Sequence, residues 1–176
     1  PYIVDGEGDY IVFGSVATYG KLGGALTIYN KKTGEYEVFR NIVQNQSIVG
    51  VAVKDGLVYG STTTSGGLGI EYPEKEAKMF VWDIKKKQKI KEWTLEYPAE
   101  VTKTGPVKII GDLEVGPDGL IWGATQGYVF AMEPVTCKIV KSAVVGDFNY
   151  SGTGQFWMPR FLRFHSNGLL YLSIDY

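Results

Sequence analysis

Short runs of alternating apolar and polar residues, bounded by glycine, asparagine or aspartate, recur along this chain. Such runs are typical of β-strands with one buried face, and no segment of useful length shows the 3.6-residue period of a helix. One phrase occurs four times: a tight turn, then an apolar strand that carries an aromatic residue. Its copies are Asp9–Gly14, Asp55–Gly60, Asp118–Gly123 and Asn167–Leu172, at steps of 46, 63 and 49 residues.

The repeat extends beyond this phrase to a unit of four strands. Each phrase is preceded by an innermost strand and followed by a polar loop, a second apolar strand, a turn and an outer strand. The second apolar strands are residues 25–29, 79–82 and 128–132. A period of roughly 40–50 residues built from four short antiparallel strands is the signature of a β-propeller blade. The sequence therefore predicts an all-β fold: a β-propeller segment of three four-stranded antiparallel blades plus half of a fourth.

The predicted blades cover approximately residues 1–43, 44–97 and 106–147, with the half-blade at 158–176, so that residues 1–176 form one partial β-propeller. Closed propellers have about four to eight blades. An open arc leaves sheet faces and strand edges uncovered, which proteins normally avoid. We therefore expect the segment to belong to a larger ring, completed either by the remaining blades of a parent chain or by a second copy.

Composition narrows the class of partner. Apolar residues make up 44% of the chain, aromatic residues 14% and charged residues 21%, and the formal net charge is −1. Without a basic stripe, nucleic acid is not expected as a partner. Without an apolar run near 18 residues, membrane insertion is not expected either. The lysine-rich segment 85–91 lies between two strand-like runs and is interpreted as a solvated hairpin turn.

Few residues are suited to catalysis or metal binding. His165 is the single histidine and lies at a hairpin corner, where a surface turn residue is favoured over a metal ligand or a catalytic base. Cys137 has no evident partner nearby that could act as a base, and it is interpreted as an inert thiol rather than a nucleophile. The glycine runs 20–24 and 65–69 precede strands, not helices, so they favour interstrand loops over phosphate loops. No catalytic residue, metal site or cofactor is predicted.

Carboxylates are the remaining candidates for chemistry. Glu71, Glu74 and Glu76 lie in the long insert of the second blade, and Asp112 lies on an innermost strand near the propeller axis. A paired acid and base is one interpretation. Nothing in the sequence sets the separation of these groups. Solvated charges are favoured, because Glu74 and Glu76 flank Lys75 in a segment that is expected to be exposed.

The longest loops all belong to one face of the predicted propeller. Loops between second and third strands, and loops between blades, emerge at the same end of the blades, where propellers usually bind ligands. These loops are rich in hydroxyls, amides and aromatic rings, which suit a sugar or another neutral polar ligand. The opposite face has short hairpins and is expected to have little concavity. The predicted ligand-binding residues are Thr18, Tyr19, Asn45, Gln46, Thr62, Gln126, Trp157 and Arg160.

Two of these residues have specific roles in this interpretation. Trp157 would supply a plane on which a sugar ring stacks. Arg160 begins an innermost strand and could bind a carboxylate in bidentate fashion, which would favour an acidic glycan over a neutral one.

Segments 45–69 and 76–83 carry a family resemblance. They are similar to large bacterial β-propeller proteins, often extracellular, with WD-like or quinoprotein-like repeats, some of which accompany polysaccharide-degrading modules. The resemblance implies an extracellular or cell-surface location. Trp82-Asp83 matches the WD dipeptide, but only one blade has it and the accompanying Gly-His is missing. The tryptophan-docking pattern of quinoproteins is also missing, so no quinone is implied.

The sequence thus favours a non-catalytic binding or scaffold propeller that could bind carbohydrate. The alternative is a propeller enzyme, either a polysaccharide lyase or a lactonase-like hydrolase, whose catalytic residues lie mostly in blades outside this chain. A lactonase-type site needs several inward acids around a divalent cation. Asp112 is the one plausible inward acid in this sequence, so the binding function is preferred.

Overall fold

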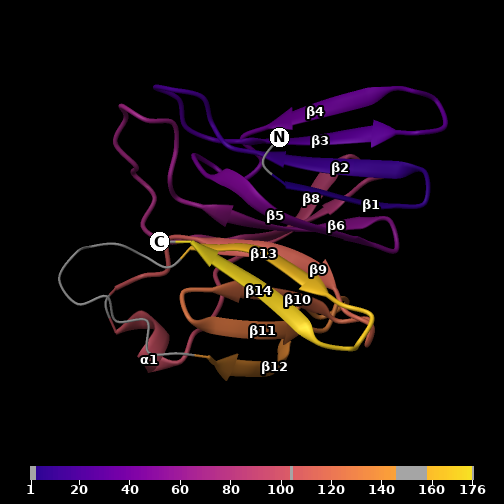
Figure 1. Cartoon of the computed structure of the whole chain (residues 1–176). Helices are drawn as coiled ribbons and strands as arrows, with labels where there is room; N and C mark the ends of the chain where they lie inside the picture. The colour runs from indigo at the N-terminus through magenta and orange to yellow at the C-terminus, as the bar shows by residue number, and fades with distance from the viewer. Residues whose placement is uncertain (1–2, 104, 146–157, 176) are drawn as a thin grey trace.

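The computed structural model describes residues 3–103, 105–145 and 158–175, with side chains of the last segment described for 161–173. It confirms the all-β fold. Three antiparallel sheets have four strands each and a further sheet has two, and none is closed on itself (Figure 1). A single helical turn, α1 (Ala99–Thr102), follows the second blade.

Each sheet is built from consecutive strands, as in propeller blades. The first blade contains β1 (Ile3–Glu7), β2 (Tyr10–Ser15), β3 (Ala25–Asn30) and β4 (Tyr36–Arg40). The second contains β5 (Ser47–Lys54), β6 (Leu57–Thr63), β7 (Met79–Asp83) and β8 (Gln88–Trp93). The third contains β9 (Ile110–Val115), β10 (Ile121–Thr125), β11 (Tyr128–Met132) and β12 (Ile139–Val144). The half-blade contains β13 (Met158–Phe164) and β14 (Leu170–Asp175).

The innermost strands β1, β5, β9 and β13 lie next to one another from blade to blade. The backbones are closest where β5 meets β9: a Cβ atom at Gly50 would lie only 2.3 Å from Gly111 O. At the same point Ser61 Oγ donates a hydrogen bond to Gly111 O over 2.6 Å. A side chain at Gly50 would push these strands apart, so glycine is required for the close approach.

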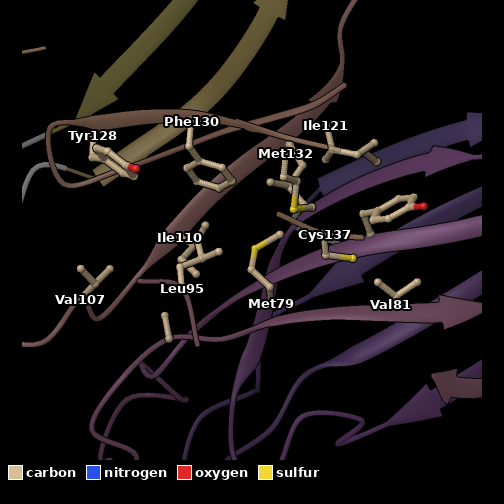
Figure 2. Packing of buried hydrophobic residues seen from close by; sticks show 14 of the residues in the cluster. Met79, Val81, Leu95, Val107, Ile110, Ile121, Tyr128, Phe130, Met132 and Cys137 are labelled. Carbon is tan, nitrogen blue, oxygen red and sulfur yellow. The ribbon is translucent and has the colours of Figure 1, made fainter. Parts of the chain in front are cut away.

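The side chains of a strand alternate between the two faces of its sheet. The second blade lies between two others, so both of its faces are buried. One face of the second blade packs on the first blade, and the other packs on the third. The cluster between the first two blades includes Ile3, Val12, Leu26, Ile28, Val51, Val53, Val58, Phe80 and Trp82. The cluster between the second and third includes Ala52, Tyr59, Met79, Val81, Ile110, Leu113, Ile121, Phe130 and Met132, most of which Figure 2 shows.

Carboxylates of innermost strands connect neighbouring blades. Asp5 Oδ2 on β1 accepts a hydrogen bond from Val53 N on β5 over 2.7 Å. Asp112 Oδ2 on β9 accepts one from Leu162 N on β13 over 3.3 Å. An innermost strand pairs along only one of its edges within its own sheet. The carboxylates of Asp5 and Asp112 accept from backbone N–H groups on the other, unpaired edge of the innermost strand of the next blade.

The repeated phrase does not superpose residue for residue in space. The turn of the first hairpin is residues 8–9, whereas the turn of the second is residues 55–56. Counted from the turn, Phe13 on β2 therefore takes the place of Gly60 on β6. An alignment by the aspartate of the phrase, as the sequence suggested, is wrong by one residue in the first blade.

Gly60 should be intolerant of any side chain. A Cβ atom there would lie 2.0 Å from Cζ of Phe80 on the facing strand. We expect Gly60→Ala to lower the free energy of unfolding by about 1–3 kcal/mol through overpacking. Phe80→Leu makes room, so the double variant should lose less than the sum of the two single losses. Urea unfolding measures all three; strictly additive losses would contradict the packing.

Candidate functional site

All long loops emerge at one end of the blades. The antiparallel strand order places the β2–β3, β6–β7 and β10–β11 loops at the same end as the connections between blades. We call this end the loop face; it lies at the left of Figure 1. The β1–β2, β3–β4 and equivalent tight turns form the opposite hairpin face at the right.

Two inserts on the loop face are bonded to each other through their backbones. They are residues 16–24, between β2 and β3, and residues 64–78, between β6 and β7. Gly20 N donates to Leu68 O over 2.9 Å, and Gly67 N donates to Lys21 O over 2.8 Å. We call this pair of loops the clasp. It joins the first and second blades away from their sheets.

Glycines permit the clasp. A Cβ atom at Gly67 would lie 1.7 Å from Thr18 O, so no other residue fits without moving the loops apart. Gly69 has a φ of 79°, and a Cβ atom there would lie 2.8 Å from the Tyr19 hydroxyl oxygen. The glycine run thus serves close backbone approach, in agreement with its interpretation as an interstrand loop.

The clasp presents apolar and aromatic side chains to solvent. Tyr19 is 78% exposed and Leu68 is 72% exposed, and Ile70 and Tyr72 are also exposed. Exposed groups of this kind, gathered on loops, are typical of interaction sites. Of the four, only Tyr19 was predicted from the sequence. The glycine run beside Leu68 was the available signal, because it marked where the insert approaches other backbone.

Asn45 lies in the connection between the first two blades and is half-buried. Its Nδ2 donates to Glu74 Oε1 over 3.0 Å, and its backbone N donates to Asn41 Oδ1 over 2.7 Å. Asn45 is therefore connected to the same insert that forms the second half of the clasp. Thr18 is exposed within the clasp itself. Thr18, Tyr19 and Asn45 thus share the loop face.

Gln46 and Thr62 are fully buried rather than solvent-facing. The Thr62 hydroxyl donates to the side-chain oxygen of Gln46 and accepts from Lys78 N at 2.8 Å. Gln46 Nε2 donates to Glu76 O over 2.9 Å. These buried hydrogen bonds connect both ends of the second insert to the segment that joins the first and second blades. Their direct role is to hold the loops in place.

The other three predicted binding residues are not joined to this group by any described contact. Gln126 is half-buried in the tight β10–β11 turn of the third blade. Arg160 lies on β13, and its side chain is outside the described residues. Trp157 also lies outside the described residues. Their part in ligand binding stays a prediction.

Asp112 is the inward acid that the sequence singled out, and it is buried against the half-blade. Arg163 bonds to its carboxylate and also donates to Glu114 Oε2 over 3.1 Å. Burial raises the pKa of Asp112, while the charge of Arg163 and the N–H groups of Leu162 and Leu113 oppose that rise. With its oxygens occupied in this way, Asp112 connects two blades and is poorly placed to act on a substrate.

His165 and Cys137 have local structural roles. His165 Nδ1 accepts from Asn167 N over 3.2 Å within the β13–β14 turn. Cys137 is buried in a turn with a φ of 58°, and burial raises the pKa of its thiol. In the described ranges no group of three or more His, Cys, Asp or Glu residues is arranged to hold a metal ion.

The carboxylates of the second-blade insert do not converge on a common point in any described hydrogen bond. Glu71 is exposed, while Glu74 and Glu76 are half-buried. Glu74 accepts from Asn45, as described above, and so supports the loop face instead of forming an acid–base pair.

The expectation of little concavity on the hairpin face was wrong. A cleft of about 680 Å³ lies there between the outer hairpins of the first two blades. It is lined by Tyr10, Ile28, Asn30, Gly34, Glu35, Tyr36, Glu37, Ile84, Lys85 and Lys87. Lys87 and Glu37 bridge it with a 2.9 Å ion pair. The sequence could not show this cleft because it depends on how the two sheets diverge.

Within the described part of the chain, no helix is long and apolar enough to cross a membrane.

Comparison with known proteins identifies the fold. No protein-family model and no curated protein matches the sequence. Among solved structures, the extracellular domain of a B. thetaiotaomicron protein described as a one-component system aligns over 98% of this chain, with 16% identity and a TM-score of 0.62. The Dos1 propeller aligns over 94% with 10% identity and a TM-score of 0.55. The β-propeller domain of the Trilobed protease from Pyrococcus furiosus aligns over 80% with 11% identity and a TM-score of 0.51.

These likenesses show the β-propeller fold and nothing finer, since all the identities are low. This chain spans 19%, 37% and 40% of the lengths of those three chains. The neighbours therefore include more structure than the blades described above.

The clasp should open when Gly67 acquires a side chain. We expect Gly67→Ala to break the two backbone bonds between the inserts, and so to speed hydrogen exchange at the Gly20 and Gly67-position amides by at least about tenfold. Ser65→Ala, a neighbouring exposed position, is the matched control and should leave exchange unchanged. Slow exchange at both amides in the Gly67 variant would show that the inserts are held by other contacts.

Loss of Arg163 should make stability depend on pH through Asp112. In Arg163→Met the buried carboxyl loses its opposing charge, so its folded-state pKa rises further above the unfolded value. The folded state then retains a proton that the unfolded chain releases, and stability falls as pH rises through this window. We expect the variant's deficit relative to wild type to be larger near about pH 7.5 than near about pH 4.5.

Adding Asp112→Asn to Arg163→Met tests the assignment, because it removes the ionisable group. Most of the extra pH dependence should disappear in the double variant, as measured by urea unfolding at the two pH values. A single and a double variant with the same pH profile would mean that another group, such as Glu114, is responsible.

Proposed function

We propose that this chain is the binding segment of a β-propeller protein and that its ligand is a glycan that contacts the clasp on the loop face. The observation that carries the proposal is the exposure of Tyr19, Leu68 and Tyr72 on loops whose backbones are bonded together. Aromatic rings stack on the CH faces of sugars. Loops that are ordered before binding lose less entropy when the ligand arrives.

Polar groups beside the clasp suit the hydroxyls of a glycan. Thr18 offers a hydroxyl in the first insert, and the Asn45–Glu74 pair lies at the side of the second. Donors and acceptors of this kind fix the orientation of a bound ligand. Gln126, Trp157 and Arg160 complete the proposed surface, and Arg160 would favour a glycan that carries a carboxylate.

A binding role is preferred to catalysis because of how Asp112 is used. Its carboxylate is committed to Arg163 and to backbone donors between two blades. The enzyme alternative depends on residues outside this chain, and no contact among the described residues favours it.

The proposed setting is extracellular, within a larger assembly. One solved structure of similar fold is an extracellular domain. Glycans of cell surfaces and polysaccharides are ligands of that environment. The partners would then be a glycan on the loop face and further blades beside the ones described.

Binding is tested on an array of neutral oligosaccharides and uronic-acid oligosaccharides, followed by titration of the best ligand. Tyr19→Ala and Leu68→Ala should each weaken binding by about tenfold, roughly 1.4 kcal/mol, because each removes contact area from the clasp. Leu169→Ala removes another exposed leucine, from the hairpin face, and serves as the control. Its affinity should match that of the wild type.

Three results would count against this proposal. The first is no glycan binding in either class. The second is binding that Tyr19→Ala and Leu68→Ala leave unchanged. The third is a loss in Leu169→Ala comparable to theirs, which would place the ligand on the hairpin face. Preference for the uronic-acid class would support the role given to Arg160.

A further inference from the structure

The cleft on the hairpin face lies between the first and second blades, at the end of the molecule opposite the clasp. Its volume of about 680 Å³ is within the roughly 300–1,000 Å³ of small-molecule sites. Its lining residues all belong to two blades whose four strands are described. The walls of the cleft are therefore complete within this part of the chain.

The corresponding place between the second and third blades is held together by hydrogen bonds. One row of facing residues on the second blade contains Tyr59, Val81 and Lys91, on β6, β7 and β8. Tyr59 is 2% exposed, and its hydroxyl donates to Pro134 O over 3.2 Å. Lys91 Nζ donates to Thr136 O over 2.9 Å. Two side chains of this row thus bind backbone carbonyls in the β11–β12 turn of the next blade.

The first blade has different side chains in the same row. Counted from the hairpin turn, Val12 takes the place of Tyr59. Ile28 and Glu37 follow Val12 on β3 and β4. Valine has no polar group, and an ionised glutamate can only accept, so neither can donate to a carbonyl. Glu37 instead pairs with the Lys87 side chain, and no described hydrogen bond joins this row to the backbone of the β7–β8 turn.

The two walls of the cleft have opposite charge. Glu35 and Glu37 lie on the wall of the first blade. Lys85 and Lys87 lie on the wall of the second blade. Glu37 and Lys87 are already paired over 2.9 Å. The Glu35 carboxylate and the Lys85 ammonium have no partner in the described contacts, so one group of each sign is left at the cleft.

The deepest residues of the cleft are apolar. Ile28 and Ile84 line it and are each 6% exposed, and both belong to the cluster between the first two blades. The half-buried Tyr10 lines the same cleft and packs against that cluster. Apolar surface of this kind binds the body of a ligand, while a few polar groups fix its orientation.

We propose that the cleft binds a short apolar peptide with free termini. The ammonium group of the peptide would lie near Glu35 on the first blade, and its carboxylate would lie near Lys85 on the second. Its apolar side chains would cover Ile28 and Ile84. A ligand with one charge would leave one of the two groups unpaired, and a neutral sugar would compensate neither. The inference does not depend on what the loop face binds.

The Lys87–Glu37 pair does not oppose this binding strongly. Its side chains are 56% and 50% exposed, and exposed pairs of this kind contribute little to stability. The termini of a peptide can therefore compete for either group. Because the contacts are electrostatic and near the surface, the affinity should fall as the salt concentration rises.

Titration with the dipeptide Leu-Phe and the tripeptide Leu-Phe-Leu, followed by backbone amide chemical shifts, tests the inference. Both peptides should saturate the protein, with the largest shifts at residues 28–37 and 84–87. The same peptides with an acetylated N-terminus, or with an amidated C-terminus, each lack one charge. Each blocked form should bind about threefold to fivefold more weakly than the free peptide.

Two substitutions identify which wall binds which terminus. In Lys85→Met the amidated peptide should bind as well as the free acid, because the partner of the carboxylate has been removed. In Glu35→Gln the acetylated peptide should bind as well as the free amine. Lys86→Met is the matched control, since Lys86 lies in the same turn, pairs with Asp83 and does not line the cleft. Its affinities should match those of the wild type.

Circular dichroism on each variant confirms that it remains folded. The proposal is wrong if neither free peptide binds saturably. It is also wrong if free and blocked peptides bind the wild type equally, or if only one of the two blocked forms binds more weakly, since the ligand then needs fewer than two charges. Discrimination that survives both Lys85→Met and Glu35→Gln would place the peptide elsewhere on the surface.

Discussion

The spacing of neighbouring sheets at their innermost strands is the constraint on which this molecule depends. Side chains between the outer strands fill a wide gap, but β5 and β9 meet with almost no room at Gly50. Because this contact sets how closely the sheets converge, it also sets how far they diverge toward the outer strands.

Polar groups near the axis adapt to the same constraint. An innermost strand pairs along one edge only, and its other edge presents unpaired N–H and C=O groups in a crowded place. Asp5 and Asp112 satisfy such groups on the next blade, and Ser61 does so in the interface between them. A catalytic interpretation of an inward acid has to be weighed against this structural need, which is present at each interface.

The strand order and the all-β fold could be predicted from the sequence because strand periodicity and turn residues are local signals. The sequence also assigned Tyr19 to the longest loops, since it lies in a polar stretch between strands, and the structure shows it exposed there. Burial of Gln46 and Thr62 could not be predicted, because it arises from a network that joins segments about 16 and 30 residues apart. The clasp likewise depends on two inserts that only blade packing brings together.

The exchange of a bulky residue between strands explains why a correct repeat still gave an incorrect alignment. In the first blade Phe13 on β2 occupies the position that Gly60 occupies on β6 of the second blade. The strand beside it has the smaller Thr27 on β3 where the second blade has Phe80 on β7. Each row keeps one aromatic ring, while the residue at each position differs. Local sequence similarity follows the aspartate of the turn and misses this compensation.

One consequence concerns the exchange of blades between propellers. A chimera in which β2 alone replaces β6 by strand register would place Phe13 opposite Phe80, two rings in the volume of one. A chimera that transfers β2 together with β3 would keep one ring in each row. Recombination of these blades therefore has to transfer the second and third strands of a blade together. The turn phrase that reveals the repeat is not by itself a transferable unit.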